Sequence, residues 1–308
     1  MGLLARSLVV LAAFAAGSWV GLHSSSAAAP APALAAAPPP VAAPSAPVAT
    51  DTPDPLADAP EINAFPHLNP EASITKAWRL AQGPHRAPGD NRKILTLTFD
   101  DGPFPETTPK VLDLLEKYHV RATFFVIGQY LDGHDERAKA SRATLQKVAA
   151  AGHFIGNHTH DHALLTAVTH TQVLEQIDRG AASIERAIGK KPVLFRPPFG
   201  ELDTFGQEAA ATRGLDILLW NVEAQDMQRD DTLTMVDDVI HQIRRNEGGV
   251  VLLHDIRYSS IVVARKVLAW LDAHKYDAAR PERAGYAIVD LPTYLREVAA
   301  APPRVRTH

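Results

Sequence analysis

Two adjacent aspartates, Asp100 and Asp101, lie within the stretch LTLTFDDGP at residues 95–103. An alternating strand-like run precedes them, and Gly102 and Pro103 follow with the residue types of a turn. Two neighbouring carboxylates repel and raise each other's pKa unless a cation or hydrogen bonds stabilise them. The pair therefore predicts either a solvated strand end or a cation site, and this stretch alone leaves both open.

A cluster of histidines lies in GNHTHDH at residues 156–162. His158 and His162 are four apart, so one helical turn would aim both imidazoles in the same direction. Two imidazoles and one carboxylate make a metal site with open positions for water and substrate. A lone histidine is more often a surface or core residue, but three in five residues favour a metal site. We expect His160 to point elsewhere and His153 to be structural.

A third stretch, FRPPFG, covers residues 195–200. Arg196 is either solvated in a proline-stiffened turn or paired with a carboxylate, with the following backbone presenting an N–H to an oxyanion. Later in the chain, Trp220 ends a strand-like run and Asp226 follows it, while His254 and Asp255 end an apolar run. Each of these features is weak alone, since a histidine at a strand end is usually a cap or a surface residue.

Alternating strands and helices would bring these residues together. The expected strands are 93–99, 122–128, 153–157, 193–196, 216–220, 249–254 and 286–291. The expected helices are 109–119, 143–152, 171–189, 232–246 and 261–275. This alternation predicts βα units and a mainly parallel sheet. About seven such units in about 200 residues fit a closed or nearly closed barrel, with reactive groups at the carboxyl ends of its strands. Asp100 and Asp101 lie at such an end, which favours the cation site.

The composition sets broader limits. The 308 residues are 46% hydrophobic and 21% charged, with a net charge of −4. This balance gives no electrostatic signature of nucleic-acid binding. The absence of cysteine excludes disulfides, thiolate metal sites and cysteine nucleophiles.

The N-terminal part predicts export. Residues 1–28 combine an early arginine, an apolar run and small residues, as a signal peptide does, although an uncleaved signal anchor is the alternative. The Ala/Pro-rich residues 29–60 predict a disordered linker. Residues 61–92 would form a lead-in, residues 93–298 a single catalytic domain and residues 299–308 a tail. The domain would then be secreted or periplasmic, or anchored to the inner membrane if the signal is retained.

Five motifs occur in a fixed order along this domain. They are TFDDGP, HTHDH, RPPFG, WNVEAQD and LLHD. This ordered set resembles the polysaccharide deacetylases, the NodB-homology domain of carbohydrate esterase family four, over roughly residues 93–298. The resemblance implies an α/β fold, a distorted (β/α)7 barrel, and a metal-dependent hydrolase.

Roles follow from the same resemblance. Asp101, His158 and His162 would bind a divalent metal, usually zinc, with Co²⁺ or Ni²⁺ as alternatives. Asp100 would be the general base for a metal-bound water, and Arg196 would orient it and balance its charge.

The remaining catalytic and substrate-binding roles also come from the resemblance. His254 would be the general acid, with its pKa tuned by Asp226. The Phe199 N–H would stabilise the oxyanion, Leu252 would contact the acetyl methyl group, and Trp220 and Met227 would contact the substrate. Met227 replaces a tryptophan that is frequent in the family, which puts substrate preference in doubt.

The expected substrate is an N-acetylated glycan. Peptidoglycan and chitin-type oligosaccharides are the favoured candidate substrates, ahead of O-acetylated xylan and an exopolysaccharide. A catalytically silent glycan-binding module and an amidase acting on a non-sugar amide are the alternatives. The sequence leaves the oligomeric state open.

Overall fold

The computed structural model describes residues 90–300, with side chains described as far as residue 298. The predicted signal peptide, the linker and nearly all of the lead-in lie outside the described residues. The same holds for the tail beyond residue 300. Their boundaries therefore remain predictions.

A parallel sheet forms the centre of the described domain. Its strands are β1 (Arg92–Asp100), β2 (Thr123–Val126), β3 (Phe154–Asn157), β4 (Leu194–Phe195), β5 (Asp216–Ile217), β6 (Val222–Glu223), β7 (Gly249–His254) and β8 (Gly285–Ile288). The strand order is β5-β4-β3-β2-β1-β7-β6, and β8 pairs with the first half of β1. Because every pair is parallel, the carboxyl ends of the strands lie at one end of the sheet.

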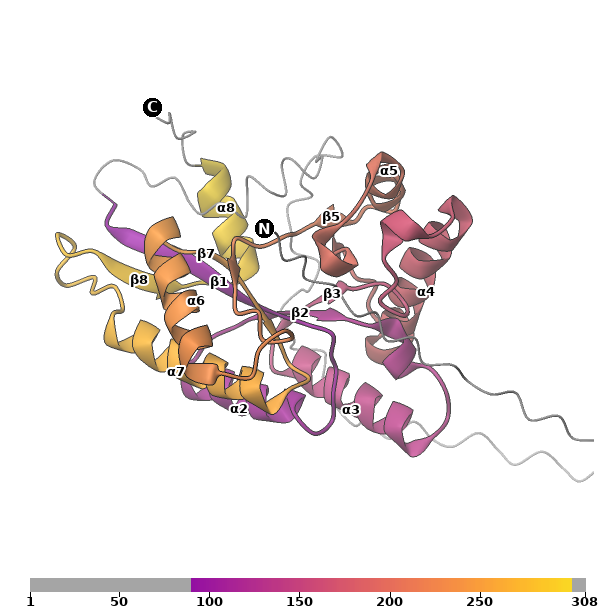
Figure 1. Ribbon diagram of the computed structural model, residues 1–308, viewed down its shortest axis with the longest axis horizontal. Helices are drawn as coiled ribbons and strands as arrows, with labels where there is room; N and C mark the ends of the chain where they lie inside the picture. Colours follow the sequence, from indigo (N-terminus) through magenta and orange to yellow (C-terminus); the bar gives the residue numbers. More distant parts are fainter. Residues whose placement is uncertain (1–89, 301–308) are drawn as a thin grey trace, which may run out of the picture. The chain divides into compact units, whose positions relative to one another are not determined.

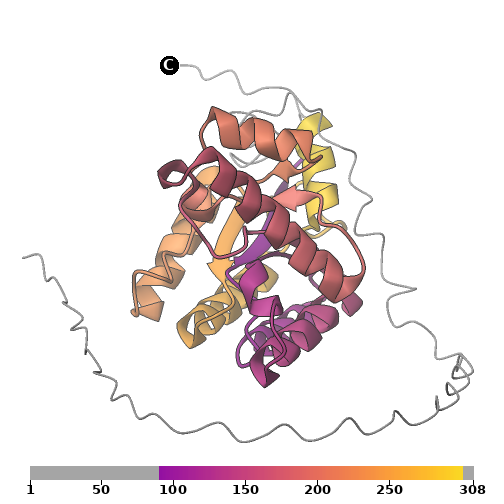
Figure 2. The same cartoon turned by 90° about the vertical axis from the view of Figure 1, so that its right-hand side faces the viewer.

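Helices connect and cover the strands. They are α2 (Thr108–Lys117), α3 (Glu136–Ala150), α4 (His170–Ile188), α5 (Thr204–Thr212), α6 (Thr232–Asn246), α7 (Tyr258–Ala273) and α8 (Leu291–Ala300). Figure 1 shows α6 and α7 toward the left of the view and α4 and α5 toward the right. In the perpendicular view of Figure 2, helices surround the central strands. Among the helices of residues 90–300, none has the length and apolar character needed to cross a membrane.

Local signals explain most helix boundaries. Helix α4 begins with a capping box between Thr169 and Gln172 and ends at Gly189, whose φ of 72° is left-handed. Helix α6 covers the predicted residues 232–246, with the Asp231 carboxylate accepting from backbone N–H groups of its first turn.

Four elements, α5, β6, β8 and α8, differ from the expectation. Helix α5 was not expected because TFGQEAAAT has no clear amphipathic period, and Asp203 caps it through the Gly206 N–H. Strand β6 is only two residues long. The expected strand 286–291 ends at Ile288 in the structure. Leu291, the last residue of the expected strand, begins helix α8, which was not predicted.

Strand β1 is buried on both faces, as expected for a strand in a covered parallel sheet. Leu95, Leu97 and Phe99 belong to one hydrophobic cluster with residues of the covering helices. By the two-residue period of a strand, Thr98 and Asp100 face the opposite way. Strict alternation would turn Asp101 away from Asp100, but its φ of 73° breaks the strand pattern at this residue.

His153 supports a prediction about pH dependence. Its imidazole is 4% exposed, and Nδ1 accepts the Ala122 N–H at 3.2 Å. Burial, with help from the Arg121 charge, lowers its pKa from 6.5 to about 4. The unfolded chain therefore binds this proton more readily, so the contribution of His153 to stability is full above pH 6.5 and is lost as pH falls toward 4.

We expect this loss to reach about 3 kcal/mol of unfolding free energy. A His153→Asn variant should lose less stability than the parent between pH 7 and 4.5, because an amide does not titrate. Urea unfolding of both proteins at the two pH values measures the difference. Parallel losses in the two proteins would contradict the prediction.

Candidate active site

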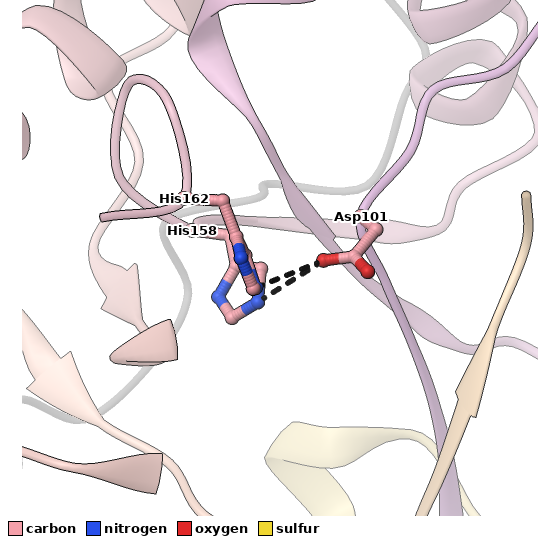
Figure 3. Close-up of side chains that lie close together, drawn as sticks. All are labelled: Asp101, His158 and His162. Carbon is pink, nitrogen blue, oxygen red and sulfur yellow. Dashed lines mark ion pairs between the residues drawn. The ribbon is translucent and has the colours of Figure 1, made fainter. Parts of the chain in front are cut away.

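Asp101, His158 and His162 meet at the carboxyl ends of β1 and β3 (Figure 3). The Asp101 Oδ1 atom lies 3.5 Å from His158 Nε2 and 3.3 Å from His162 Nε2. One ligand atom from each residue lies within 4.8 Å of the others. The structure thus brings together the three residues that the sequence predicts as metal ligands.

A backbone contact sets the tautomer of His158. Its Nδ1–H donates to the Arg196 carbonyl oxygen at 2.7 Å, and a carbonyl can only accept. Nε2 is therefore the ring nitrogen that faces Asp101. Such a bond on the far nitrogen is what orients metal-ligating histidines.

The histidine loop is not helical. Residues 158–162 contain no helical turn, with bends at residues 160 and 161, and Thr159 and His162 have left-handed φ values of 67° and 63°. The expectation that one helical turn aligns the two imidazoles was therefore wrong. His162 is held instead by its N–H, which donates to Thr159 Oγ1 at 3.1 Å, and by edge contact with the Phe199 ring.

Backbone strain is concentrated at this end of the sheet. Within residues 90–300, five of the seven non-glycine residues with positive φ follow its strands: Asp101, Thr159, His162, Phe199 and Gln225. Such conformations cost of order 1–3 kcal/mol each and persist where the surrounding structure enforces them. Their clustering here marks this end as the functional one.

Asp100 and Arg196 form a buried ion pair. Arg196 Nη1 donates to Asp100 Oδ1 at 2.7 Å, and the arginine side chain is fully buried. The same guanidinium donates to Thr98 Oγ1 and to the Leu218 carbonyl and lies 4.1 Å from the Phe125 ring centroid. The other oxygen, Asp100 Oδ2, lies 3.7 Å from His158 Nε2 and so faces the Asp101 cluster.

His254 and Asp226 form a second buried pair. His254 Nδ1 lies 2.7 Å from Asp226 Oδ1, and the His254 backbone N–H donates to Asp226 Oδ2 at 3.0 Å. Burial by itself lowers the pKa of His254, but Asp226 and the two other aspartates outweigh it and raise the pKa to about 9. His254 Nε2 is then left pointing toward Asp101, 3.8 Å from its Oδ2.

The expected substrate-binding residues surround this centre. Phe199 is 61% exposed with a left-handed φ of 61°, and Met227 is 38% exposed next to Asp226. Leu252 is buried in β7, two residues before His254 and on the same face. Trp220 is partly buried and lies 5.4 Å from the Arg196 guanidinium.

Other contacts at the site escaped sequence reasoning. Thr98 accepts from Arg196 and donates to the Val251 carbonyl, a role that the alternation of β1 could have suggested. His160 points away from the three predicted ligands, as expected, but its partner, the Asp132 carboxylate at 2.9 Å, was not predicted. Thr108 and Asp255 bond to each other although 147 positions separate them, and no local signal links such positions.

The donor set fits a divalent cation. Asp101 Oδ1 is buried without a hydrogen-bond partner in the described protein, which is costly for a carboxylate oxygen. Burial alone would raise the pKa of Asp101, yet the three neighbouring imidazoles hold it below its ordinary value, so the carboxylate is ionised. Burial lowers the pKa of His162, and the deprotonated imidazole is the form that binds a metal.

The comparison with known families agrees with this geometry. The profile of the family described as Polysaccharide deacetylase matches residues 87–218. The chain is 34% identical over 192 residues to a peptidoglycan-N-acetylglucosamine deacetylase of Bacillus cereus and covers 85% of it. The chain therefore belongs to the polysaccharide deacetylase family. Asp226 and His254 lie beyond residues 87–218, but His254 Nε2 lies 3.8 Å from Asp101 Oδ2 and Asp226 is bonded to His254.

Other relatives carry related names. The chain is 36% identical over 186 residues to the peptidoglycan-N-acetylmuramic acid deacetylase PdaC of Bacillus subtilis, but spans only 37% of that protein's length. It is 36% identical to a chitooligosaccharide deacetylase of Sinorhizobium fredii, over 54% of this chain and 74% of that protein.

The solved structure of PdaC resembles the described domain. It aligns with a TM-score of 0.54 and 32% identity, over 68% of this chain and 92% of that structure. The predicted distorted (β/α)7 barrel is confirmed.

Proposed function

We propose that this protein is a metal-dependent deacetylase of an N-acetylated glycan, acting outside the cytoplasm. The observation that carries the proposal is the convergence of three units on Asp101. These units are the Asp101–His158–His162 donor set, the Asp100–Arg196 pair and the His254–Asp226 pair.

Asp101, His158 and His162 would hold a divalent ion, with zinc the leading candidate and cobalt or nickel the alternatives. A bound ion of this kind polarises a carbonyl and lowers the pKa of water toward neutrality. The protein's residues then have to place the acetamide, remove one proton and supply another.

Asp100 would accept the proton of the attacking water. Arg196 occupies Asp100 Oδ1 and leaves Oδ2 facing the Asp101 cluster. The guanidinium also gives the buried Asp100 carboxylate a charged hydrogen-bond partner. A positioned base is worth about 10²–10⁴-fold in rate.

His254 would donate a proton to the leaving amine. Its Nδ1 is engaged by Asp226, so the Nε2–H side is left for the substrate. With a pKa of about 9, the imidazole is protonated at neutral pH.

The acetamide would be bound by the residues around this centre. The Phe199 N–H would donate to the oxyanion of the tetrahedral intermediate, and Leu252 would contact the acetyl methyl group. Trp220 and the exposed Met227 and Phe199 would contact the sugar. Peptidoglycan and chitin-type oligosaccharides are the favoured substrates, because the relatives are named for them.

Acetate release tests the proposal. Metal-loaded protein is incubated with N-acetylglucosamine oligomers, peptidoglycan and O-acetylated xylan, and released acetate is measured. We expect release from at least one N-acetylated glycan. Binding of these glycans without release would support a catalytically silent module instead, and release from small non-sugar amides alone would indicate an amidase.

Metal removal gives a further prediction. Treatment with a chelator should abolish acetate release, and added Zn²⁺ or Co²⁺ should restore it. An ion at 100 times its dissociation constant stabilises the folded state by about 2.7 kcal/mol, so the stripped protein should also melt at a lower temperature. An unchanged melting temperature and unchanged turnover after verified removal would contradict the assignment of the donor set.

A further inference from the structure

Asp255 is a buried acid with no role in the proposed chemistry. It follows His254 at the end of β7, and its side chain is fully buried. Burial raises its pKa to about 7. Its Oδ2 accepts from Thr108 Oγ1 at 2.5 Å, and its Oδ1 has no hydrogen-bond partner within the part of the chain that the structure describes. A buried carboxyl oxygen without a hydrogen-bond partner lowers the stability of the fold, so the presence of Asp255 at this position calls for an explanation.

The partner of Asp255 holds the turn after Asp101. The Thr108 hydroxyl accepts the Phe104 N–H at 2.8 Å, and its single proton is therefore free to go to Asp255. Phe104 is three positions after Asp101, and Thr108 opens α2. A chain of two hydrogen bonds thus connects the residue after His254 to the loop that carries Asp101.

The Asp255 carboxyl also packs against Gly102. A Cβ added to Gly102 would collide with both carboxyl oxygens of Asp255. Gly102 is not among the glycines with left-handed φ, so close approach, and not backbone freedom, accounts for this glycine. The Gly102 carbonyl in turn accepts the Ile127 N–H at 3.0 Å, and the Asp255 N–H donates to the Asp100 carbonyl at 3.4 Å.

These contacts join the two halves of the site. The turn at Gly102 follows directly from Asp100 and Asp101, while Asp255 directly follows His254. We infer that Asp255, through Thr108 and Gly102, is a positioning residue that sets the place of the Asp101 carboxylate relative to the His254 imidazole. An apolar residue of the same volume would fill the space but would leave the Thr108 hydroxyl without its acceptor.

The inference rests on the proposed metal site but is tested on binding as well as on turnover. Thr108→Val keeps the shape of the side chain and removes both hydrogen bonds. We expect it to weaken Co²⁺ binding by about tenfold to a hundredfold, the usual effect of losing a residue that orients a ligand. We also expect kcat to fall by a similar factor with little change in KM. Thr108→Ser restores the hydroxyl and should recover most of both.

The matched control is Thr144→Val. Thr144 is also a buried helical threonine, and its hydroxyl donates to the Ala140 carbonyl within α3. This variant should lower the melting temperature slightly and leave Co²⁺ affinity and kcat unchanged. Co²⁺ affinity is measured by chelator competition, and melting is followed by circular dichroism.

A compensation experiment covers the case in which Thr108→Val does not fold. Gly102→Ala introduces the collision with Asp255 and should weaken Co²⁺ binding. Combining it with Asp255→Ala removes the carboxyl that the added methyl group would strike, so the double variant should bind Co²⁺ more tightly than the two separate losses predict. Strictly additive losses would argue against contact between these residues as the cause.

The outcomes separate the two proposals. Wild-type Co²⁺ affinity and kcat in a folded Thr108→Val protein, with only a lower melting temperature, would overturn the positioning role. If the parent protein binds Co²⁺ but releases no acetate from any glycan, the proposed function fails. The binding measurements still decide the role of Asp255 in that case.

Discussion

An Asp100→Asn variant should lose about 10²–10⁴-fold in kcat while it keeps its affinity for Co²⁺. The amide cannot accept the proton of the attacking water, but it preserves the volume of the side chain. Its oxygen can still accept from Arg196, which holds this side chain at 2.7 Å. Asp101, His158 and His162, the predicted ligands, are untouched. The Asp100→Asn variant should therefore have a much lower kcat but an unchanged affinity for Co²⁺.

The experiment pairs acetate release with Co²⁺ titration by chelator competition. Asp101→Asn is the contrasting variant and should lose metal affinity together with turnover. Asp113→Asn, an exposed change in α2, controls for the effect of removing one acid. Unchanged kcat in Asp100→Asn would exclude Asp100 as the base, and lost Co²⁺ binding would indicate that Asp100 itself ligates the metal.

The second large effect concerns stability. Arg196→Met should lower the free energy of unfolding by about 3–5 kcal/mol at pH 7, the usual cost of removing one member of a buried ion pair. The Asp100 carboxylate, 3% exposed, would lose its cation. The Leu218 and Leu219 carbonyls would also lose the donors they have now.

Urea unfolding of the metal-loaded protein measures this loss. Arg213→Met is the matched control, because Arg213 pairs with Asp178 at the surface and such pairs are worth about 0–1 kcal/mol. Adding Asp100→Leu to Arg196→Met should return part of the lost stability, since no charge is then left buried. A loss in Arg196→Met no larger than in the surface control would show that the buried pair is not required for stability.

Regular patterns in the sequence predicted much of the fold. The alternating run before Asp100 and the helix-length amphipathic segments predicted a parallel α/β barrel, because burial of apolar faces follows the two-residue and 3.6-residue periods. Helix α6 matches its predicted limits because a capping aspartate precedes it. Strand β6 and helix α5 were missed because they are short and their residues show neither period over a sufficient length. Helix α8 was missed because its first residue, Leu291, was assigned to the expected strand 286–291.

The site was predictable to the level of residue type and order. Acids after a strand and histidines four apart indicate metal chemistry, and the ordered motifs resemble one family. The arrangement of the histidine loop was not predictable in the same way. Left-handed conformations at Thr159 and His162 depend on contacts with the surrounding loops, and spacing alone suggested a helical turn.

By itself, then, the sequence predicted that residues 95–101 form a buried strand with two acids at its end, and it favoured a cation as their partner. The tertiary structure decided how the two acids differ. Arg196 reaches Asp100 from 96 positions away, while the left-handed backbone of Asp101 turns the next carboxylate toward His158 and His162. It also assigned Gly102 to the close approach of Asp255 and not to a turn alone. These features depend on contacts between segments distant in the chain, which local periodicity does not encode.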